Sequence, residues 1–230
     1  MLNWIQQFNI FCFLDNQQYQ HQPAQFECLA AVGCLQRLAV PAGDAFEQLK
    51  VFSDQFPDWL FGHFSFDLKN EIAGLNTNQS DGIGFPDLHF FVPQYVLQLQ
   101  ANELHIYAVD KVAADYVYAS LLASAEQLDT ACSCDPIRIQ NRMSKADYLD
   151  AVKRLKQHIL RGDCYEINFC QEFFATTVKL NPLATYQRLA KFSPNPFAVF
   201  YRDHDLYCMG ASPERYLSLK ENELCSQPIK

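Results

Sequence analysis

The residues best placed to do chemistry lie near the end of the sequence, where a carboxylate and an amine fall in one predicted β-hairpin. Segments 215–219 and 224–227 have the alternation typical of strands, with a polar turn between them. If the pairing is centred on Asn222, Glu214 opposes Lys230 at the open end of the hairpin. The sequence therefore predicts that this carboxylate and this amine lie close together.

A Glu–Lys pair of this kind has two interpretations. A lysine shielded from water can lose its proton and act as a nucleophile, and a neighbouring carboxylate can exchange protons with a substrate hydroxyl. A charged Glu214 favours the ammonium form of Lys230, so catalysis requires proton transfer between them or strong desolvation. The alternative is an exposed ion pair, which contributes at most ~1 kcal/mol to stability.

A second candidate, Glu166, lies in CYEINFCQEFF (164–174), where apolar and polar residues alternate except at Gln171. This alternation predicts a strand with Glu166 on its polar face. Such a face is exposed to water or lines a polar cavity, and the residues alone favour exposure to water.

Composition narrows the class of protein. The 230 residues are enough for one large domain or two small ones, and 49% of them are hydrophobic, which supplies a sizeable core. A net charge of −8 argues against nucleic acid or anionic membranes as partners. We find no apolar run of ~20 residues and no signal-peptide pattern, so we expect a cytoplasmic protein.

Glycine and cysteine usage excludes other kinds of site. There are 8 glycines and no glycine-rich phosphate-binding pattern. The 9 scattered cysteines predict reduced thiols, many of them buried. Cys132 and Cys134 are too close together for a zinc knuckle, and there is no histidine pair at ligand spacing. We therefore expect no metal ligands in this chain.

The remaining patterns predict an α+β fold, with largely antiparallel sheets and flanking helices. Segment 26–33 is ambiguous between strand and helix, and 76–84 has the composition of a loop. Strands are predicted at 8–14, 59–66, 94–100 and 103–109, and on both sides of Asp203-His204. Helices are predicted at 44–55, at 110–127, from Ser144 to Gly162, and from Asn181-Pro182 to about Phe192.

Several motifs together resemble the chorismate-binding enzyme family. They occur in the family's order and cover nearly the whole chain. The motifs are FDLKNEI (66–72), FPDLHFFVP (85–93), GDCYEINFCQEF (162–173), SPNPF (193–197), GASPERYL (210–217) and QPIK (227–230).

The resemblance implies two parts in this chain. Residues 1–135 resemble the family's N-terminal lobe, and 144–230 resemble the start of its catalytic domain, with 128–143 as the connection. Lys230 falls in the middle of a family motif that continues with Gly-Thr. We therefore expect the chain to be an incomplete portion of the fold, and to be inactive and prone to associate when alone.

Two positions point to one branch of the family, aminodeoxychorismate synthase component I. Members of this branch have a lysine in the P-I-K motif, here Lys230, where anthranilate and isochorismate synthases usually have alanine. Isochorismate and salicylate synthases have a lysine at the position of Glu166, and amine-adding relatives usually have glutamine there. Glu166 departs from both patterns, which leaves its role open.

By this resemblance the reaction converts chorismate and ammonia to 4-amino-4-deoxychorismate for para-aminobenzoate and folate biosynthesis. Lys230 would attack C2 of chorismate, Glu214 would act as general acid for the departing C4 hydroxyl, and ammonia would come from a glutamine amidotransferase subunit. Mg²⁺ would bind the chorismate carboxylate, with its ligands outside this chain.

In some relatives the N-terminal lobe binds tryptophan, at a motif after the first strand and at an Asn-Pro-aromatic turn. The matching residues are Asp15 and Asn16, and Asn195, Pro196 and Phe197. Asp15-Asn16 replaces the usual Glu-Ser, and a packed turn without a ligand is the alternative. Two other functions remain open for the whole chain: anthranilate synthase component I, and a non-catalytic module that binds tryptophan or a partner.

Overall fold

The computed structural model describes residues 1–19, 26–76, 81–108, 114–125, 137–176 and 178–229. Contacts divide the chain into two compact units, which are described separately. The first comprises Met1–Asp129 and Pro182–Lys230, and the second comprises Thr130–Asn181. None of the described helices is long and apolar enough to cross a membrane.

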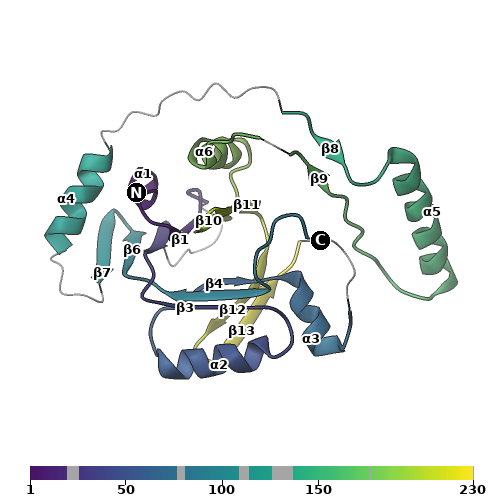
Figure 1. Cartoon of the computed structure of the whole chain (residues 1–230), viewed down its shortest axis with the longest axis horizontal. Helices are drawn as coiled ribbons and strands as arrows, with labels where there is room; N and C mark the ends of the chain where they lie inside the picture. The colour runs from purple at the N-terminus through teal and green to yellow at the C-terminus, as the bar shows by residue number, and fades with distance from the viewer. Residues whose placement is uncertain (20–25, 77–80, 109–113, 126–136, 177, 230) are drawn as a thin grey trace. The chain divides into compact units, whose positions relative to one another are not determined.

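A six-stranded antiparallel sheet forms the centre of the first unit, in the order β11-β10-β1-β2-β6-β7 (Figure 1). Its central strand β1 pairs with β2 on one side and with β10, nearly 190 residues later in the chain, on the other. The strands are β1 (Ile10–Asp15), β2 (Cys28–Val32), β6 (Tyr95–Gln100), β7 (Glu103–Ala108), β10 (Phe197–Asp203) and β11 (Leu206–Ser212).

Strand β1 is apolar without interruption because both of its faces are buried. Phe11 and Phe13 lie in a core cluster on one face, while Ile10 and Cys12 lie in a second cluster on the other. The first cluster includes residues of three helices, which cover that face of the sheet. These helices are α1 (Leu2–Ile5), α4 (Ala114–Ala125) and α6 (Pro182–Phe192).

A three-stranded antiparallel sheet, in the order β3-β5-β4, packs against the other face. Phe61 and Phe91 of this sheet join Ile10, Cys12 and Tyr201 of the larger sheet in the second cluster. The strands are β3 (Gln36–Val40), β4 (Phe61–Phe64) and β5 (Leu88–Val92). A third cluster joins this sheet to α2 (Ala45–Gln55) and to the 3-10 helix η1 (Phe66–Leu68). Helix α3 (Lys69–Ala73) follows η1.

The last element of the first unit is the hairpin of β12 (Arg215–Lys220) and β13 (Glu223–Gln227), which form a two-stranded sheet of their own. Many of its apolar side chains are exposed within the described part of the chain. They include Tyr216, Leu217, Leu219 and Leu224.

The second unit contains one long helix and one short ladder. Helix α5 (Lys145–Arg161) begins at Ser144, whose side chain accepts a hydrogen bond from the Asp147 amide, and ends at Gly162 in the left-handed conformation. Strand β8 (Gln140–Asn141) pairs with β9 (Phe173–Phe174). The cap and the stop of this helix are as predicted from the sequence.

The strand predicted over 164–174 is wrong for all but its last two residues. Only Phe173–Phe174 has a strand partner in the described part of the chain, and the rest of the segment is irregular. On the predicted apolar face Tyr165 is 91% exposed, and Phe169 stacks on Tyr148 of α5 rather than on a neighbouring strand. Alternation creates a strand only where a neighbouring strand supplies hydrogen bonds.

The other sequence expectations can be compared in the same way. The α+β fold with antiparallel sheets and flanking helices is confirmed, and segment 26–33 is a strand. The expectation that many cysteines are buried is wrong, because among the seven described cysteines only Cys12 is buried. Cys132, Cys134 and most of the connection 128–143 lie outside the described residues. The two-part division at 135–144 stays a prediction, although contacts group Pro182–Lys230 with the N-terminal residues.

Candidate functional site

Glu214 lies between two hairpins, after β11 ends at Ser212 and before β12 begins at Arg215. Its backbone is held by Ser212, whose Oγ accepts a hydrogen bond from the Glu214 amide at 3.2 Å and donates to the Glu214 carbonyl at 3.1 Å. Its side chain is exposed and makes no hydrogen bond or ion pair within the described part of the chain. The carboxylate is therefore free to meet a substrate or another segment.

The predicted register of the β12–β13 hairpin requires correction. Lys220 pairs with Glu223 across a two-residue turn, and a bulge between Arg215 and Ser218 shifts the register so that Arg215 pairs with Gln227. Extending this register places Glu214 opposite Pro228 rather than Lys230. The pairing centred on Asn222 is therefore wrong, and Lys230 lies outside the described residues.

Glu166 belongs to the second unit and is exposed in the irregular segment that precedes β9. Because the two units are described separately, the structure leaves open whether Glu166 and Glu214 come together. The three expected active-site positions, Glu166, Glu214 and Lys230, therefore stay predictions.

The tryptophan-pocket candidates of the first unit do lie in neighbouring segments. Asp15, the last residue of β1, is the register partner of Ala198, which follows Phe197. Burial raises the pKa of Asp15 above its ordinary value, although a hydrogen bond from the Gln17 amide opposes this effect. The buried side chain of Asn16 donates to the Phe26 carbonyl at 3.3 Å and accepts from the Gln18 amide at 2.9 Å.

Tyr186 of α6 is a polar residue at this end of β1 that sequence reasoning missed. Its ring stacks on Phe200, and its buried hydroxyl lies near the side chain of Gln17 without forming a hydrogen bond of good geometry within the described residues. Burial and the charge of Asp15 raise the pKa of Tyr186. A buried unsatisfied hydroxyl close to a carboxylate is a position where a polar ligand group can be accepted.

The Asn195-Pro196-Phe197 turn is held by side-chain hydrogen bonds. Asn195 is half-buried, and its Nδ2 donates to Ser193 Oγ at 2.8 Å and to the Ala211 carbonyl at 3.2 Å. The ring of Phe197 lies under the Arg215 guanidinium, 5.0 Å from ring centroid to Cζ. The turn is therefore tied to the chain on both sides of Glu214.

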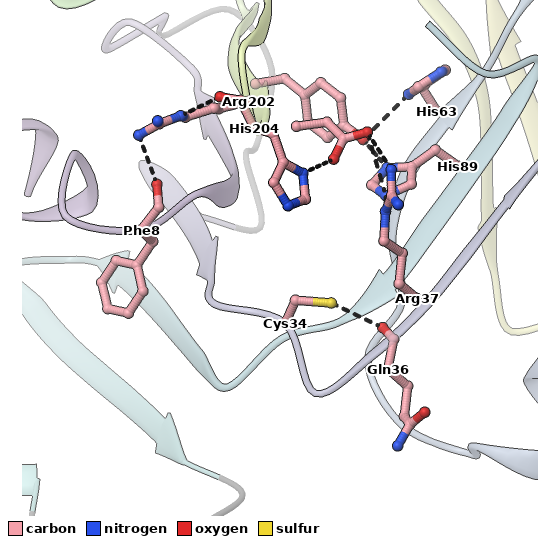
Figure 2. A network of polar contacts seen from close by, with 10 residues as sticks. Phe8, Cys34, Gln36, Arg37, His63, His89, Arg202 and His204 are labelled. Carbon is pink, nitrogen blue, oxygen red and sulfur yellow. Dashed lines mark hydrogen bonds and ion pairs between the residues drawn. The ribbon is translucent and has the colours of Figure 1, made fainter.

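A buried polar network joins the two sheets of the first unit (Figure 2). Arg37 of β3 donates from Nη2 to Asp203 Oδ2 at 2.8 Å and from Nε to His89 Nε2 at 3.0 Å. His204 contacts the other oxygen of Asp203 at 2.9 Å. His89 and Asp203 are 0% and 2% exposed, whereas Arg37 and His204 reach them from the surface with 40% and 58% of their side chains exposed.

The donors of the network assign the histidine tautomers. Because Nε2 of His89 accepts from Arg37, its proton lies on Nδ1, which donates to the Tyr201 hydroxyl. Tyr201 can then donate to Nδ1 of His63 at 3.3 Å, and His63 Nε2 donates to the Pro86 carbonyl at 2.9 Å. Every member of this chain is satisfied with His89 neutral.

Charge and burial shift the pKa values of His89 and Asp203 in opposite directions. Burial lowers the pKa of His89 to about 4, against the opposing effect of the Asp203 charge. Burial favours protonation of Asp203, but hydrogen bonds from His204 and Arg37 and the nearby positive charge hold its pKa below the ordinary value. His89 and Asp203 could have been found from the sequence because each is a polar residue within or beside an apolar strand. A polar residue in such a position is buried only when it has hydrogen-bond partners.

The lowered pKa of His89 predicts that the protein loses stability in mild acid. In the unfolded chain a histidine takes up a proton near pH 6.5, whereas folded His89 does so only near pH 4. Below pH 6.5 the unfolded state therefore binds more protons, and the free energy of unfolding falls by about 3 kcal/mol between pH 6.5 and 4. Asp203 contributes in the same direction only at lower pH.

Urea unfolding at a series of pH values measures this effect. His89→Gln should flatten the dependence between pH 6.5 and 4, whereas the same change at the half-exposed His105 should leave it intact. If the free energy of unfolding of His89→Gln falls as steeply with decreasing pH as that of the unchanged protein, other groups cause the acid sensitivity.

Magnesium was expected to have its ligands outside this chain. Across the described ranges no group of three or more His, Cys, Asp or Glu residues is arranged to hold a metal ion. The magnesium expectation stays a prediction.

Comparison with known proteins gives the family. The model of the chorismate binding enzyme family matches residues 11–230. The chain belongs to this family. The resemblance inferred from the sequence motifs is thereby confirmed.

Curated relatives of this chain divide between two activities. It is 25% identical over 179 residues to aminodeoxychorismate synthase component 1 of Salmonella typhimurium, covering 76% of this chain and 38% of that protein. It is 26% identical over 189 residues to anthranilate synthase component 1 of Vibrio cholerae, covering 76% and 36% respectively. The match thus spans less than two fifths of these relatives, and at this identity the two activities are not distinguished.

Solved structures of the family share the fold. Anthranilate synthase component I from Streptococcus pneumoniae superposes with a TM-score of 0.65 at 20% identity, over 88% of this chain and 53% of that chain. The menaquinone-specific isochorismate synthase MenF from Escherichia coli gives a TM-score of 0.50 at 12% identity, over 94% and 47%. The chain therefore has about half of the fold of these enzymes.

Proposed function

We propose that this chain forms the N-terminal lobe and the first part of the catalytic domain of an aminodeoxychorismate synthase component I. The observation that carries the proposal is the lysine of the QPIK motif, Lys230, in a chain that belongs to the chorismate-binding family. A lysine offers a nucleophilic amine that the alanine usual in anthranilate and isochorismate synthases lacks. The substrates are chorismate and ammonia, and ammonia is supplied by a glutamine amidotransferase subunit.

In the proposed mechanism one difficult substitution at C4 is replaced by two easier steps. The Lys230 amine forms a bond to C2 of chorismate while the C4 hydroxyl leaves as water with a proton from Glu214. Ammonia then forms a bond to C4, and the Lys230 amine leaves C2. Mg²⁺, bound by residues outside this chain, would neutralise the substrate carboxylate.

The free carboxylate of Glu214 supports its role as the acid. Its backbone is fixed by Ser212 while its side chain remains exposed, as expected of a group that must reach a substrate. Glu166 is proposed to take the place of the glutamine usual in amine-adding relatives.

Product analysis tests the function. The protein that contains this chain, extended by its coding sequence past Lys230, is incubated with chorismate, ammonium and Mg²⁺, and the products are separated by chromatography. We expect 4-amino-4-deoxychorismate. Formation of anthranilate, with inhibition by tryptophan, would instead establish an anthranilate synthase.

The 230-residue chain alone tests the remaining alternative, a non-catalytic module that binds tryptophan or a partner. We expect it not to turn over chorismate. If it binds tryptophan in a calorimetric titration and the extended protein is also inactive, the chain is a binding module rather than part of an enzyme. Asp15, Asn16 and the 195–197 turn are the residues proposed to line that tryptophan pocket, with Tyr186 beside them.

A further inference from the structure

The position of Glu214 is set by the end of the β10–β11 hairpin. Phe197 of β10 pairs with Ser212 of β11, and the strand pairing ends at this pair. Asn195 lies two residues before Phe197, and Glu214 lies two residues after Ser212. In an antiparallel pair the continued register therefore brings Asn195 and Glu214 to the same level, on opposite chains.

Asn195 closes this end of the hairpin with its side chain instead of its backbone. Its Nδ2 donates across the hairpin to the Ala211 carbonyl at 3.2 Å, and back to Ser193 Oγ at 2.8 Å. Ala211 is three residues before Glu214, so this hydrogen bond holds the strand end from which the Glu214 backbone departs. The side chain is half-buried, which reduces competition from water.

Two further contacts fix the chain around Glu214. On its N-terminal side the Ser212 hydroxyl forms hydrogen bonds with the amide and the carbonyl of Glu214. The residue between them, Pro213, has a restricted backbone conformation. On its C-terminal side Arg215 lies over the Phe197 ring and donates to Ser218 Oγ at 3.3 Å. The backbone is held on both sides, whereas the carboxylate is unbound within the described residues.

The geometry points to Asn195 as the positioning residue for the carboxylate of Glu214, acting through the Ala211 carbonyl. The inference rests on the proposed role of Glu214 as general acid, and it gives the Asn195 turn a function that needs no bound tryptophan. Displacement of a catalytic group by about 1 Å can reduce a rate by as much as a hundredfold. Loss of the Asn195 hydrogen bond should therefore affect turnover and leave chorismate binding unchanged.

Steady-state kinetics of the extended protein, with saturating ammonium and without tryptophan, test this inference. Asn195→Asp has nearly the same shape but has no Nδ2–H donor. We expect its kcat to fall about ten- to a hundredfold, with KM for chorismate almost unchanged. Asn222→Asp, the same substitution at an exposed turn of the next hairpin, is the matched control and should retain full kcat.

A double-mutant cycle separates positioning from a general structural role. In a Glu214→Gln background, Asn195→Asp should cause no further loss, because there is no longer an acid to position. Equal losses in both backgrounds, or a normal kcat in Asn195→Asp, would overturn the inference. Ser212→Ala removes another tie to Glu214 and should reproduce the kcat loss if Asn195→Asp fails to fold.

Failure of the proposed function gives a different result. If Glu214→Gln alone retains full turnover, Glu214 is not the general acid, and the positioning role of Asn195 is also wrong. If Glu214→Gln is slow but Asn195→Asp is normal, the mechanism stands and only the positioning role is lost. Hydrogen exchange of the Glu214 amide provides a readout independent of activity, and we expect it to be faster in Asn195→Asp than in Asn222→Asp.

Discussion

Lys230→Ala is expected to abolish the formation of 4-amino-4-deoxychorismate by the protein that contains this chain. Alanine has no amine to form the bond to C2, so substitution at C4 would lose its covalent intermediate. Removal of a nucleophile from a covalent mechanism typically reduces kcat by about 10³-fold or more. The measurement is product formation with free ammonia, so that a defect in the amidotransferase partner has no effect.

The control is Lys220→Ala, which removes an exposed lysine from the turn end of the β12–β13 hairpin. It should retain activity. Chorismate binding by Lys230→Ala, measured by calorimetry, should be preserved, because the lysine is proposed to act in chemistry rather than in recognition. Turnover near the normal rate in Lys230→Ala would remove the covalent mechanism, and with it the main reason for preferring this branch of the family.

Asp203→Ala is expected to have the largest effect on stability. Asp203 is 2% exposed and accepts hydrogen bonds from Arg37 and His204, so its loss leaves the Arg37 guanidinium without its buried counter-charge. Removing one partner of a buried ion pair typically costs about 3–5 kcal/mol. We expect a value near the lower limit, about 3 kcal/mol, because Arg37 is 40% exposed and can turn toward water.

Urea unfolding of this chain, followed by the fluorescence of the buried Trp4, measures this loss. Asp205→Ala changes an exposed aspartate in the same hairpin turn and should be nearly neutral. In an Arg37→Met background the cost of Asp203→Ala should be smaller, because the charge to be compensated is absent. An equal cost in both backgrounds would show that the ion pair is not the source of the stability.

The Asp203 network also has a consequence for the candidate site. Strand β10 is anchored at its Asp203 end by Arg37 of the three-stranded sheet, and at its other end it leads back to Asn195 and across to Glu214. A strand fixed by both neighbours of its sheet and by a buried network is a rigid support for an exposed catalytic group. Asp203→Ala should therefore loosen the β10–β11 hairpin that leads to Glu214, in addition to lowering the overall stability.

Local sequence patterns were sufficient for several elements of the two units. The β6–β7 and β10–β11 hairpins were predicted from alternation around short polar turns, and α5 from its Ser144 cap and Gly162 stop. These elements depend on neighbouring residues, whose spacing is visible in the sequence. The same patterns failed for 164–174, because a strand also requires a partner strand, and alternation carries no information about one.

The register of the last hairpin shows a second limit. A bulge at Arg215–Ser218 displaces Glu214 from the position expected by simple pairing. A bulge is set by the twist and packing of the strands, which short-range spacing does not reveal. For the same reason the sequence did not show that the backbone around Glu214 is held by Asn195 and Ser212 while its carboxylate is unbound within the described residues.

What the sequence determined by itself is the family and the antiparallel α+β class, because motifs and periodicity are local. Only the tertiary structure decided that β1 lies between β2 and β10, that Arg37, His89 and Asp203 form one buried network, and that Asn195 is tied to the strand end before Glu214. These contacts join residues far apart in the chain, such as Ile10 with Asp203 in the β1–β10 pair and Arg37 with Asp203 in the network. Such pairs form because burial of both sheet faces leaves polar groups no partner except one another.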